Sequence, residues 1–158
     1  ETVGVLLAAA RHKGASVVEV LQHCVIFNPQ SYDDVYSKET RKANAIYLRE
    51  GQPMVFGANN EFGLMQDGFG IKVARLGENG ITEKDLLVHD PHTADPTLHL
   101  KLALMEGPDF PVALGVIRDV EAPTYNEEVH RQIEEIKAKK PYHNFAELVD
   151  TNNTWTVE

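Results

Sequence analysis

Cys24 is the only cysteine of the chain and its most versatile residue chemically. It lies in the stretch LQHCVIFN, directly after His23, where an apolar run gives way to a polar loop. A lone cysteine is commonly a small buried apolar side chain, but a thiolate also serves as a nucleophile beside a base or as a metal ligand. Neighbours on a strand point to opposite faces, so His23 is poorly placed to activate Cys24 if the preceding strand continues that far. The hydrolase interpretation is therefore the weakest of the three.

Three histidines, His89, His92 and His99, form a second group together with Asp90 and Asp95 in the stretch VHDPHTADPTLH. Zinc needs three or four convergent ligands. His89 and His92 would converge only on a helix, and Pro91 between them disfavours a helix. We therefore interpret the stretch as a polar loop that leads into a helix with His99 on its surface.

The glycine-rich stretch GANNEFGLMQDGFG invites comparison with phosphate-binding loops. It matches neither the dinucleotide pattern GxGxxG nor the pattern GxxxxGK[ST]. Turns at Asn59-Asn60 and Asp67-Gly68, both suited to positive φ, account for its glycines as parts of hairpins. We expect no phosphate site there.

The elements before Cys24 have the pattern of an α/β fold. Apolar residues from Val3 to Ala10 recur at helical spacing, and Gly14 follows as a plausible helix end. The next segment, SVVEVL from Ser16 to Leu21, is β-branched and apolar, as expected for a strand covered on both faces. Cys24 would then lie just past the carboxyl end of a strand, where ligands gather in open α/β sheets.

The chain after Asn28 is predicted to be a mixed α+β region. Short strands with hairpins are expected in AIYLRE, PMVFG, EFGLMQ and GFGIKVARL, followed by a strand from Phe110 to Ile117. A helix should begin at Asp95-Pro96 and run to about Met105. A longer C-terminal helix is marked by a capping box of Thr124 and Glu127 and by an apolar stripe. Trp155 is expected to anchor the tail on the core.

Composition limits the class of protein. The 158 residues are 42% hydrophobic and 25% charged, which suits one globular core, and the formal net charge of -9 disfavours nucleic acid and anionic membranes as partners. No apolar run approaches the roughly 20 residues of a membrane span. A single cysteine fits a reducing compartment, so a cytoplasmic location is expected.

Several stretches together resemble a known family. AAARHKGASVVEVLQHCVIFN, REGQPMVFG, GFGIKVARL, VHD and RDVEAPTYNE are similar to the C-terminal part of the β subunit of 2-oxoacid:ferredoxin oxidoreductases, most of all the 2-oxoglutarate branch. The likeness runs from Glu1 to the final NTWTV. Its most specific element is His12-Lys13-Gly14 followed by the Cys-x-x-Phe-Asn motif that begins at Cys24.

The resemblance implies an enzyme that decarboxylates a 2-oxoacid on thiamine diphosphate and Mg²⁺, passes electrons through [4Fe-4S] clusters to ferredoxin, and transfers the acyl group to coenzyme A. It implies an α subunit as partner and an oligomeric assembly. It also implies that Cys24 is the fourth ligand of a cluster. The choice between 2-oxoglutarate, pyruvate and other 2-oxoacids stays open.

Other motifs of that family are missing. The chain has no Gly-Asp-Gly for the pyrophosphate and no Cys-x-x-Cys. We therefore expect a C-terminal fragment, with residues 1–28 ending the α/β thiamine-diphosphate domain and residues 29–158 forming a β-subunit extension. Alone it is expected to be inactive, without cofactor or catalytic residues. The alternative is a structural module that docks subunits without chemistry of its own.

Overall fold

The computed structural model describes residues 1–140, 142–150, 155 and 157, and the chain forms two compact units. The first unit contains Glu1–His12 and Ser16–Glu121. The second contains Lys13–Ala15 and Ala122–Glu158. The boundary expected at Asn28 is not tested by this division and stays a prediction. Mixed helices and strands agree with the α/β class expected from the sequence.

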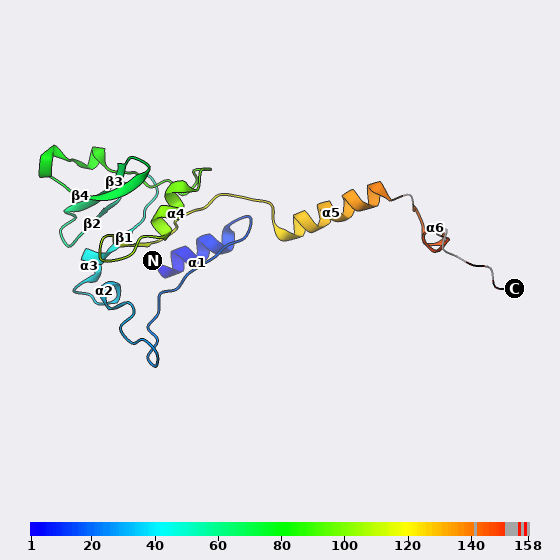
Figure 1. Ribbon diagram of the computed structural model, residues 1–158, viewed down its shortest axis with the longest axis horizontal. Helices are drawn as coiled ribbons and strands as arrows, with labels where there is room; N and C mark the ends of the chain where they lie inside the picture. Colours follow the sequence, from blue (N-terminus) through cyan, green and yellow to red (C-terminus); the bar gives the residue numbers. More distant parts are fainter. Residues whose placement is uncertain (141, 151–154, 156, 158) are drawn as a thin grey trace. The chain divides into compact units, whose positions relative to one another are not determined.

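An antiparallel sheet in the order β2-β3-β4 is built from two hairpins (Figure 1). The strands are β2 (Val55–Phe56), β3 (Phe62–Asp67) and β4 (Gly70–Arg75). Asn60 has a φ of 56° in the first turn and Gly68 a φ of 57° in the second, which confirms both turns predicted from the sequence. The glycine-rich stretch thus contains the turns of both hairpins.

A second, parallel sheet joins segments far apart in the sequence. Strand β1 (Ala45–Tyr47) pairs with β5 (Val112–Leu114), with Ile46 opposite Ala113. The strand predicted from Phe110 to Ile117 is therefore shorter than expected. Gly115 follows it with a φ of 120°, and a Cβ there would lie 3.1 Å from the carbonyl oxygen of Leu48. This close backbone approach needs a glycine and ends the regular strand.

The buried apolar residues of the first unit form one core around the sheets. Ile46, Leu64 and Leu102 are at most 1% exposed. The core cluster is Ile46, Leu48, Met54, Phe56, Leu64, Leu102 and Met105. It draws on β1, β2 and β3 and on the helix after residue 96, so one body of packed side chains holds these elements together.

The helices of the first unit are short apart from the N-terminal one. They are α1 (Thr2–Arg11), α2 (Asp33–Tyr36), α3 (Arg41–Asn44) and α4 (Thr97–Ala103), with 3₁₀ turns η1 (Glu78–Gly80) and η2 (Glu83–Asp85). The helix predicted near the N-terminus is confirmed. Helix α4 starts later than predicted, because Asp95 Oδ1 accepts the backbone N–H of Thr97 at 2.9 Å and Pro96 stands at the cap. It also ends before Met105.

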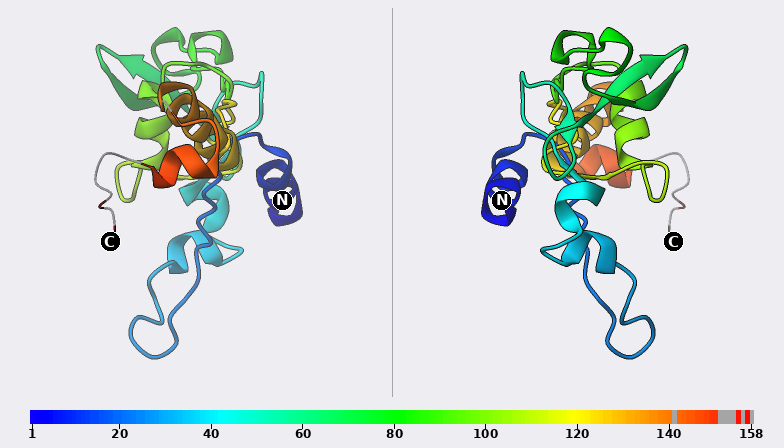
Figure 2. Two further views of the ribbon diagram at one scale, coloured as in Figure 1. Left: turned by 90° about the vertical axis from the view of Figure 1, so that its right-hand side faces the viewer. Right: turned by 90° about the vertical axis from the view of Figure 1, so that its left-hand side faces the viewer.

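The strand predicted from Ser16 to Leu21 is not formed. The segment belongs to neither sheet, and Val17 is 96% exposed. A strand is stable only with a hydrogen-bonded neighbour, and no described strand pairs with these residues. The chain from this segment to α2 extends away from the two sheets (Figure 2).

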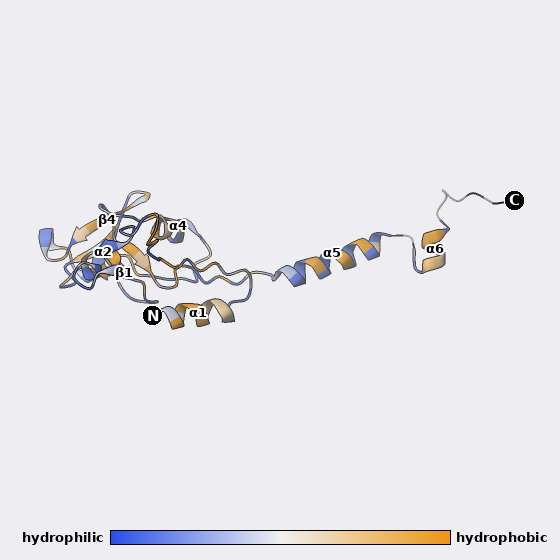
Figure 3. Ribbon diagram, turned by 90° about the horizontal axis from the view of Figure 1, so that it is seen from below, coloured by the Kyte–Doolittle hydropathy of each residue, from blue (hydrophilic) through white to orange (hydrophobic). Residues whose placement is uncertain are grey.

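The second unit consists of helices and their flanking segments. Helix α5 (Tyr125–Lys139) begins at the predicted capping box, in which Glu127 Oε2 accepts the N–H of Thr124 at 2.8 Å. A short helix α6 (Phe145–Val149) follows, capped by Asn144. The side chain of Trp155 is 84% exposed, so the predicted anchoring on a core is wrong. Apolar and polar residues alternate around α5 in Figure 3.

Across the described ranges, every helix is too short or too polar to traverse a lipid bilayer.

Candidate functional site

Cys24 opens a tight turn whose backbone curls around its sulfur. The N–H of Asn28 donates to the carbonyl oxygen of Cys24 at 3.0 Å, and the two residues form an isolated antiparallel bridge. The N–H of Phe27 donates to Cys24 Sγ at 3.5 Å. Cys24 itself is exposed, so the interpretation as a small buried side chain is wrong.

Backbone donors in this turn favour the thiolate. They hold the pKa of Cys24 below its ordinary value, with the N–H of Phe27 as the largest cause and those of Ile26 and Asn28 as further ones. Hydrogen bonds to the charged form stabilise it, and only the backbone supplies them here. The turn therefore prepares a sulfur that can coordinate a metal or act as a nucleophile.

His23 is directed to other partners than the thiol. Its Nε2 lies 3.8 Å from Asp33 Oδ1, and its ring packs edge-on against Tyr36 with 4.6 Å between centroids. Its Nδ1 is buried and has no hydrogen-bond partner among the described residues. No described contact joins His23 to Cys24 Sγ, so the geometry gives no base for a Cys-His hydrolase.

The residues that follow Cys24 form an apolar rim. Val25, Ile26 and Phe27 are 82%, 79% and 89% exposed. Apolar side chains that lie next to one another on a surface favour contact with another protein surface. Cys24 is nevertheless a single donor: within residues 1–140, 142–150, 155 and 157 no three His, Cys, Asp or Glu side chains converge as a metal set would.

His99 is buried, contrary to the surface position expected from the sequence, and is only 4% exposed. Arg118 Nη1 donates to His99 Nδ1 at 2.9 Å, while His99 Nε2 lies 2.8 Å from the carbonyl oxygen of Asp90. An arginine can only donate and a carbonyl can only accept, so Nδ1 is the acceptor and Nε2 the donor of these two contacts. His99 thus fixes the loop rather than binding metal.

His89 is likewise buried, at 1% exposed, and its ring lies edge-on to that of His99 with 6.5 Å between centroids. Its Nε2–H donates to the carbonyl oxygen of Val116 at 2.8 Å, and Nδ1 has no partner among the described residues. Burial is the largest cause that lowers the pKa of His89, against the opposing hydrogen bond to Val116. The neutral ring is therefore favoured.

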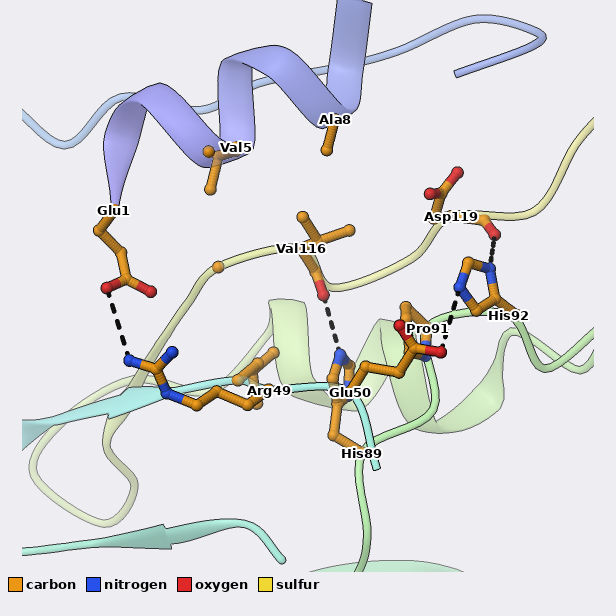
Figure 4. A pocket seen from close by; sticks show the side chains of 13 residues that line it. Glu1, Val5, Ala8, Arg49, Glu50, His89, Pro91, His92, Val116 and Asp119 are labelled. Atoms are coloured by element: carbon orange, nitrogen blue, oxygen red, sulfur yellow. Dashed lines mark hydrogen bonds and ion pairs between the residues drawn. The ribbon is translucent and has the colours of Figure 1, made fainter. Parts of the chain in front are cut away.

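A pocket of about 490 Å³ lies beyond the carboxyl ends of the parallel strands β1 and β5 (Figure 4). Its lining residues are Glu1, Gly4, Val5, Ala8, Leu48, Arg49, Glu50, His89, Pro91, His92, Gly115, Val116 and Asp119. No pattern in the sequence indicates this pocket. Both strands are predictable locally, but nothing signals that residues 45–47 and 112–114 pair.

Charged groups around the pocket are already paired with each other. Arg49 lies 3.8 Å from Glu1, and His12 Nδ1 lies 2.6 Å from Asp119 Oδ1. His92 Nδ1 donates to the carbonyl oxygen of Asp119 at 2.6 Å, and its Nε2 lies 3.6 Å from Glu50. The bond to Asp119, with Glu50 nearby, raises the pKa of His92. The His12–Asp119 contact joins the end of α1 to the segment after β5, and the Arg49–Glu1 pair joins its start to the segment after β1, which is a structural role.

The chain is similar to one characterised protein over almost its whole length. It is 36% identical over 157 residues, 98% of the chain, to the 2-oxoglutarate oxidoreductase subunit KorB of Mycobacterium tuberculosis. This confirms the resemblance found in the sequence, which is to the C-terminal part of the β subunit of a 2-oxoglutarate:ferredoxin oxidoreductase. The chain spans about 41% of the length of this relative. No protein-family model and no solved structure matches it.

Proposed function

Since 98% of the chain is similar to a 2-oxoglutarate oxidoreductase subunit, we propose that it is part of the β subunit of a 2-oxoglutarate:ferredoxin oxidoreductase. The whole enzyme would oxidatively decarboxylate the 2-oxoacid to its acyl-CoA and pass the electrons to ferredoxin. Ferredoxin, coenzyme A and an α subunit are its proposed partners, in the cytoplasm. The observation that carries this proposal is the similarity to that subunit, and the exposed Cys24 turn carries the assignment of a cluster ligand.

The turn fits one corner of an iron-sulfur cluster. A [4Fe-4S] cluster is held by four thiolates, and amide hydrogen bonds to the ligand sulfurs tune its potential. Cys24 Sγ is exposed and accepts the Phe27 N–H, which matches a cluster ligand. When bound, such a cluster supplies one-electron transfer. The apolar rim of Val25, Ile26 and Phe27 would exclude water around it.

Thiamine diphosphate and Mg²⁺ do not fit the residues of this chain. The sequence has no Gly-Asp-Gly, and the glycine-rich stretch forms the β2-β3-β4 hairpins rather than a phosphate cradle. The pocket near His89 offers charges that are paired among themselves rather than a cradle for an anion. We therefore assign these cofactors to other parts of the enzyme, and the chain alone is expected to be inactive.

The test replaces Cys24 in the β subunit that contains this chain, expressed together with its α partner. The Cys24→Ser change should lower the content of iron and acid-labile sulfide and the visible charge-transfer absorption. Val25→Ser, which changes the same rim and keeps the thiol, is the matched control. Equal cluster content in the Cys24→Ser enzyme and the wild type would remove Cys24 from the ligand set.

Subunit docking is a second candidate function, supported by a separate observation. No described residue from Ala122 to the C-terminus is buried, although the segment contains many large apolar side chains. Apolar groups left in water favour association with another surface. Docking is compatible with the first proposal and needs no chemistry from this part of the chain.

A further inference from the structure

The second unit leaves its apolar side chains unburied. Its large apolar residues are all at least 38% exposed where they are described, apart from Val129, which is partly buried. The exposed ones are Tyr125, Ile133, Ile136, Tyr142, Phe145, Leu148, Val149, Trp155 and Val157. A helix of this length gains most of its stability from packing one face, so α5 needs a partner surface.

The apolar residues of α5 lie in one stripe. Tyr125, Val129, Ile133 and Ile136 are separated by four, four and three residues, which places them within about 80° of arc around the helix. The side opposite the stripe carries Arg131, which forms ion pairs with Glu128 and Glu135 on one flank. A stripe of this width is suited to a second helix that lies along it.

Charges at the two ends of α5 are of opposite sign. Glu127 and Glu128 stand in the first turn, and Lys137 and Lys139 in the last. This order complements the helix dipole. It also makes the helix complementary to itself, because an antiparallel copy sets acidic end against basic end, while a parallel copy sets like charges against each other.

One antiparallel alignment of the two helices brings the apolar stripes into contact and also places opposite charges next to each other. With the two-fold axis close to Gln132 and Ile133, Val129 faces Ile136 of the second copy. On the flank of the stripe, Glu128 comes close to Lys139 of the second copy, and the pair occurs twice by symmetry. Both apolar and charged contacts are then made by the same alignment.

We propose that the apolar stripe of α5 binds α5 of a second copy of this chain in an antiparallel pair. The proposal rests on the docking role and names its partner. It does not depend on Cys24, so failure of the cluster assignment and failure of the pairing are seen in separate experiments.

The first test is self-association of the 158-residue chain, followed by sedimentation equilibrium up to about 1 mM, because one helix face forms a small interface. We expect a monomer-dimer equilibrium that Ile133→Glu and Ile136→Glu weaken at least tenfold, with helix content checked by circular dichroism. Phe69→Glu is the matched control, since Phe69 is 100% exposed on the β3-β4 hairpin. It should leave the equilibrium unchanged.

The charge argument is tested by mixing variants. Glu128→Lys makes both members of the proposed Glu128–Lys139 contact basic, and Lys139→Glu makes both acidic. Like charges then face each other at this contact, so each variant alone should dimerise less than the wild type. Mixed together they should form a heterodimer. Absence of dimers in the mixture, where both variants stay helical, would contradict the charge pairing.

Cysteine cross-linking distinguishes the direction of pairing. In a Cys24→Ser background, Gln132→Cys should form an intermolecular disulfide because it lies near the two-fold axis, while Asn126→Cys should not. A parallel pair would bring both copies of residue 126 to the same end of the dimer, whereas the antiparallel pair places them at opposite ends. Cross-linking of Asn126→Cys, a strictly monomeric chain, or an equilibrium insensitive to Ile133→Glu would each overturn the proposal. The proposal would also be overturned if the backbone amides of α5 were protected from hydrogen exchange only after the α subunit is added.

Discussion

At the scale of single residues, Cys24 shows how a backbone turn alone can favour a thiolate. The donors are the N–H groups of Phe27, Ile26 and Asn28, and the adjacent His23 takes no part. The neighbouring histidine in the sequence suggests a catalytic pair that the structure does not form. Sequence adjacency places two residues near each other but does not aim their side chains at each other.

The titration of the Cys24 thiol shows whether the backbone N–H groups or His23 lower its pKa. In the isolated chain the thiol should alkylate with a midpoint below that of an ordinary cysteine, because the backbone donors lower its pKa. His23→Gln should leave the midpoint unchanged, as read from the pH dependence of the iodoacetamide rate. A midpoint that moves by a full pH unit in His23→Gln would mean that the histidine acts on the thiol.

Arg118 is expected to stabilise the loop before α4 although it lies on the surface. Its guanidinium donates to the carbonyl oxygens of Thr93 and Ala94 and to buried His99. Arg118→Ala leaves these acceptors unpaired, so the free energy of unfolding should fall by about 1–3 kcal/mol in urea denaturation.

Arg131→Ala is the control for this measurement, since it removes an arginine whose ion pairs on α5 are exposed. Exposed ion pairs are worth about 0–1 kcal/mol. Equal losses for the two variants would show that the contacts of Arg118 carry no special stability.

At the scale of elements, local patterns predicted helices and turns well and the sheets less well. The capping box of Thr124 and Glu127 and the turns at Asn60 and Gly68 are confirmed, because each depends on a few neighbouring residues. The strand expected from Ser16 to Leu21 failed, because a strand depends on a partner that its own sequence does not specify.

The candidate site follows the same division. Local sequence located Cys24 in its turn but could not show which groups bond to its sulfur. The burial of His89 and His99 depends on contacts with Val116 and Arg118, about 20 to 30 residues away, which no local pattern reveals. The pocket at the carboxyl ends of β1 and β5 depends on a pairing across more than 60 residues.

Gly63 in β3 is expected to be needed for the packing of Leu86 on the sheet. A Cβ on Gly63 would overlap the side chain of Leu86, which is only 6% exposed. Gly63→Ala should therefore lower the free energy of unfolding by about 1–3 kcal/mol. Combining it with Leu86→Val should recover part of the loss in urea denaturation. A Gly63→Ala protein as stable as the wild type would show that Leu86 can repack without cost.

At the scale of the whole molecule, the pH dependence of stability should carry the signature of buried His89. Burial lowers its pKa in the folded state below the value of about 6.5 expected in the unfolded chain. The unfolded state then binds the proton more readily, so stability is present above about pH 6.5 and is lost as the pH falls through the folded pKa. The pKa of exposed His92 is raised in the folded state, so the contribution of His92 to stability is lost as the pH rises rather than as it falls.

Urea denaturation at several pH values between about 7.5 and 5 checks this expectation. His89→Gln keeps a donor for the carbonyl oxygen of Val116 but cannot titrate, so its stability should depend less on pH than that of the wild type. His130→Gln, an exposed position on α5, is the matched control. An unchanged pH dependence in His89→Gln would mean that other groups cause the acid destabilisation.

The division into two units leads to a final prediction about the chain as a whole. The core cluster draws only on residues between Ile46 and Met105, and no described residue after Glu121 is buried. Removing residues 122–158 should therefore change the free energy of unfolding of the first unit, measured by urea denaturation, by less than about 0.5 kcal/mol. The same truncation should abolish dimerisation, because α5 is gone. A truncated chain that unfolds much more readily would show that the C-terminal unit stabilises the core, and a truncated chain that still dimerises would place the interface in the first unit.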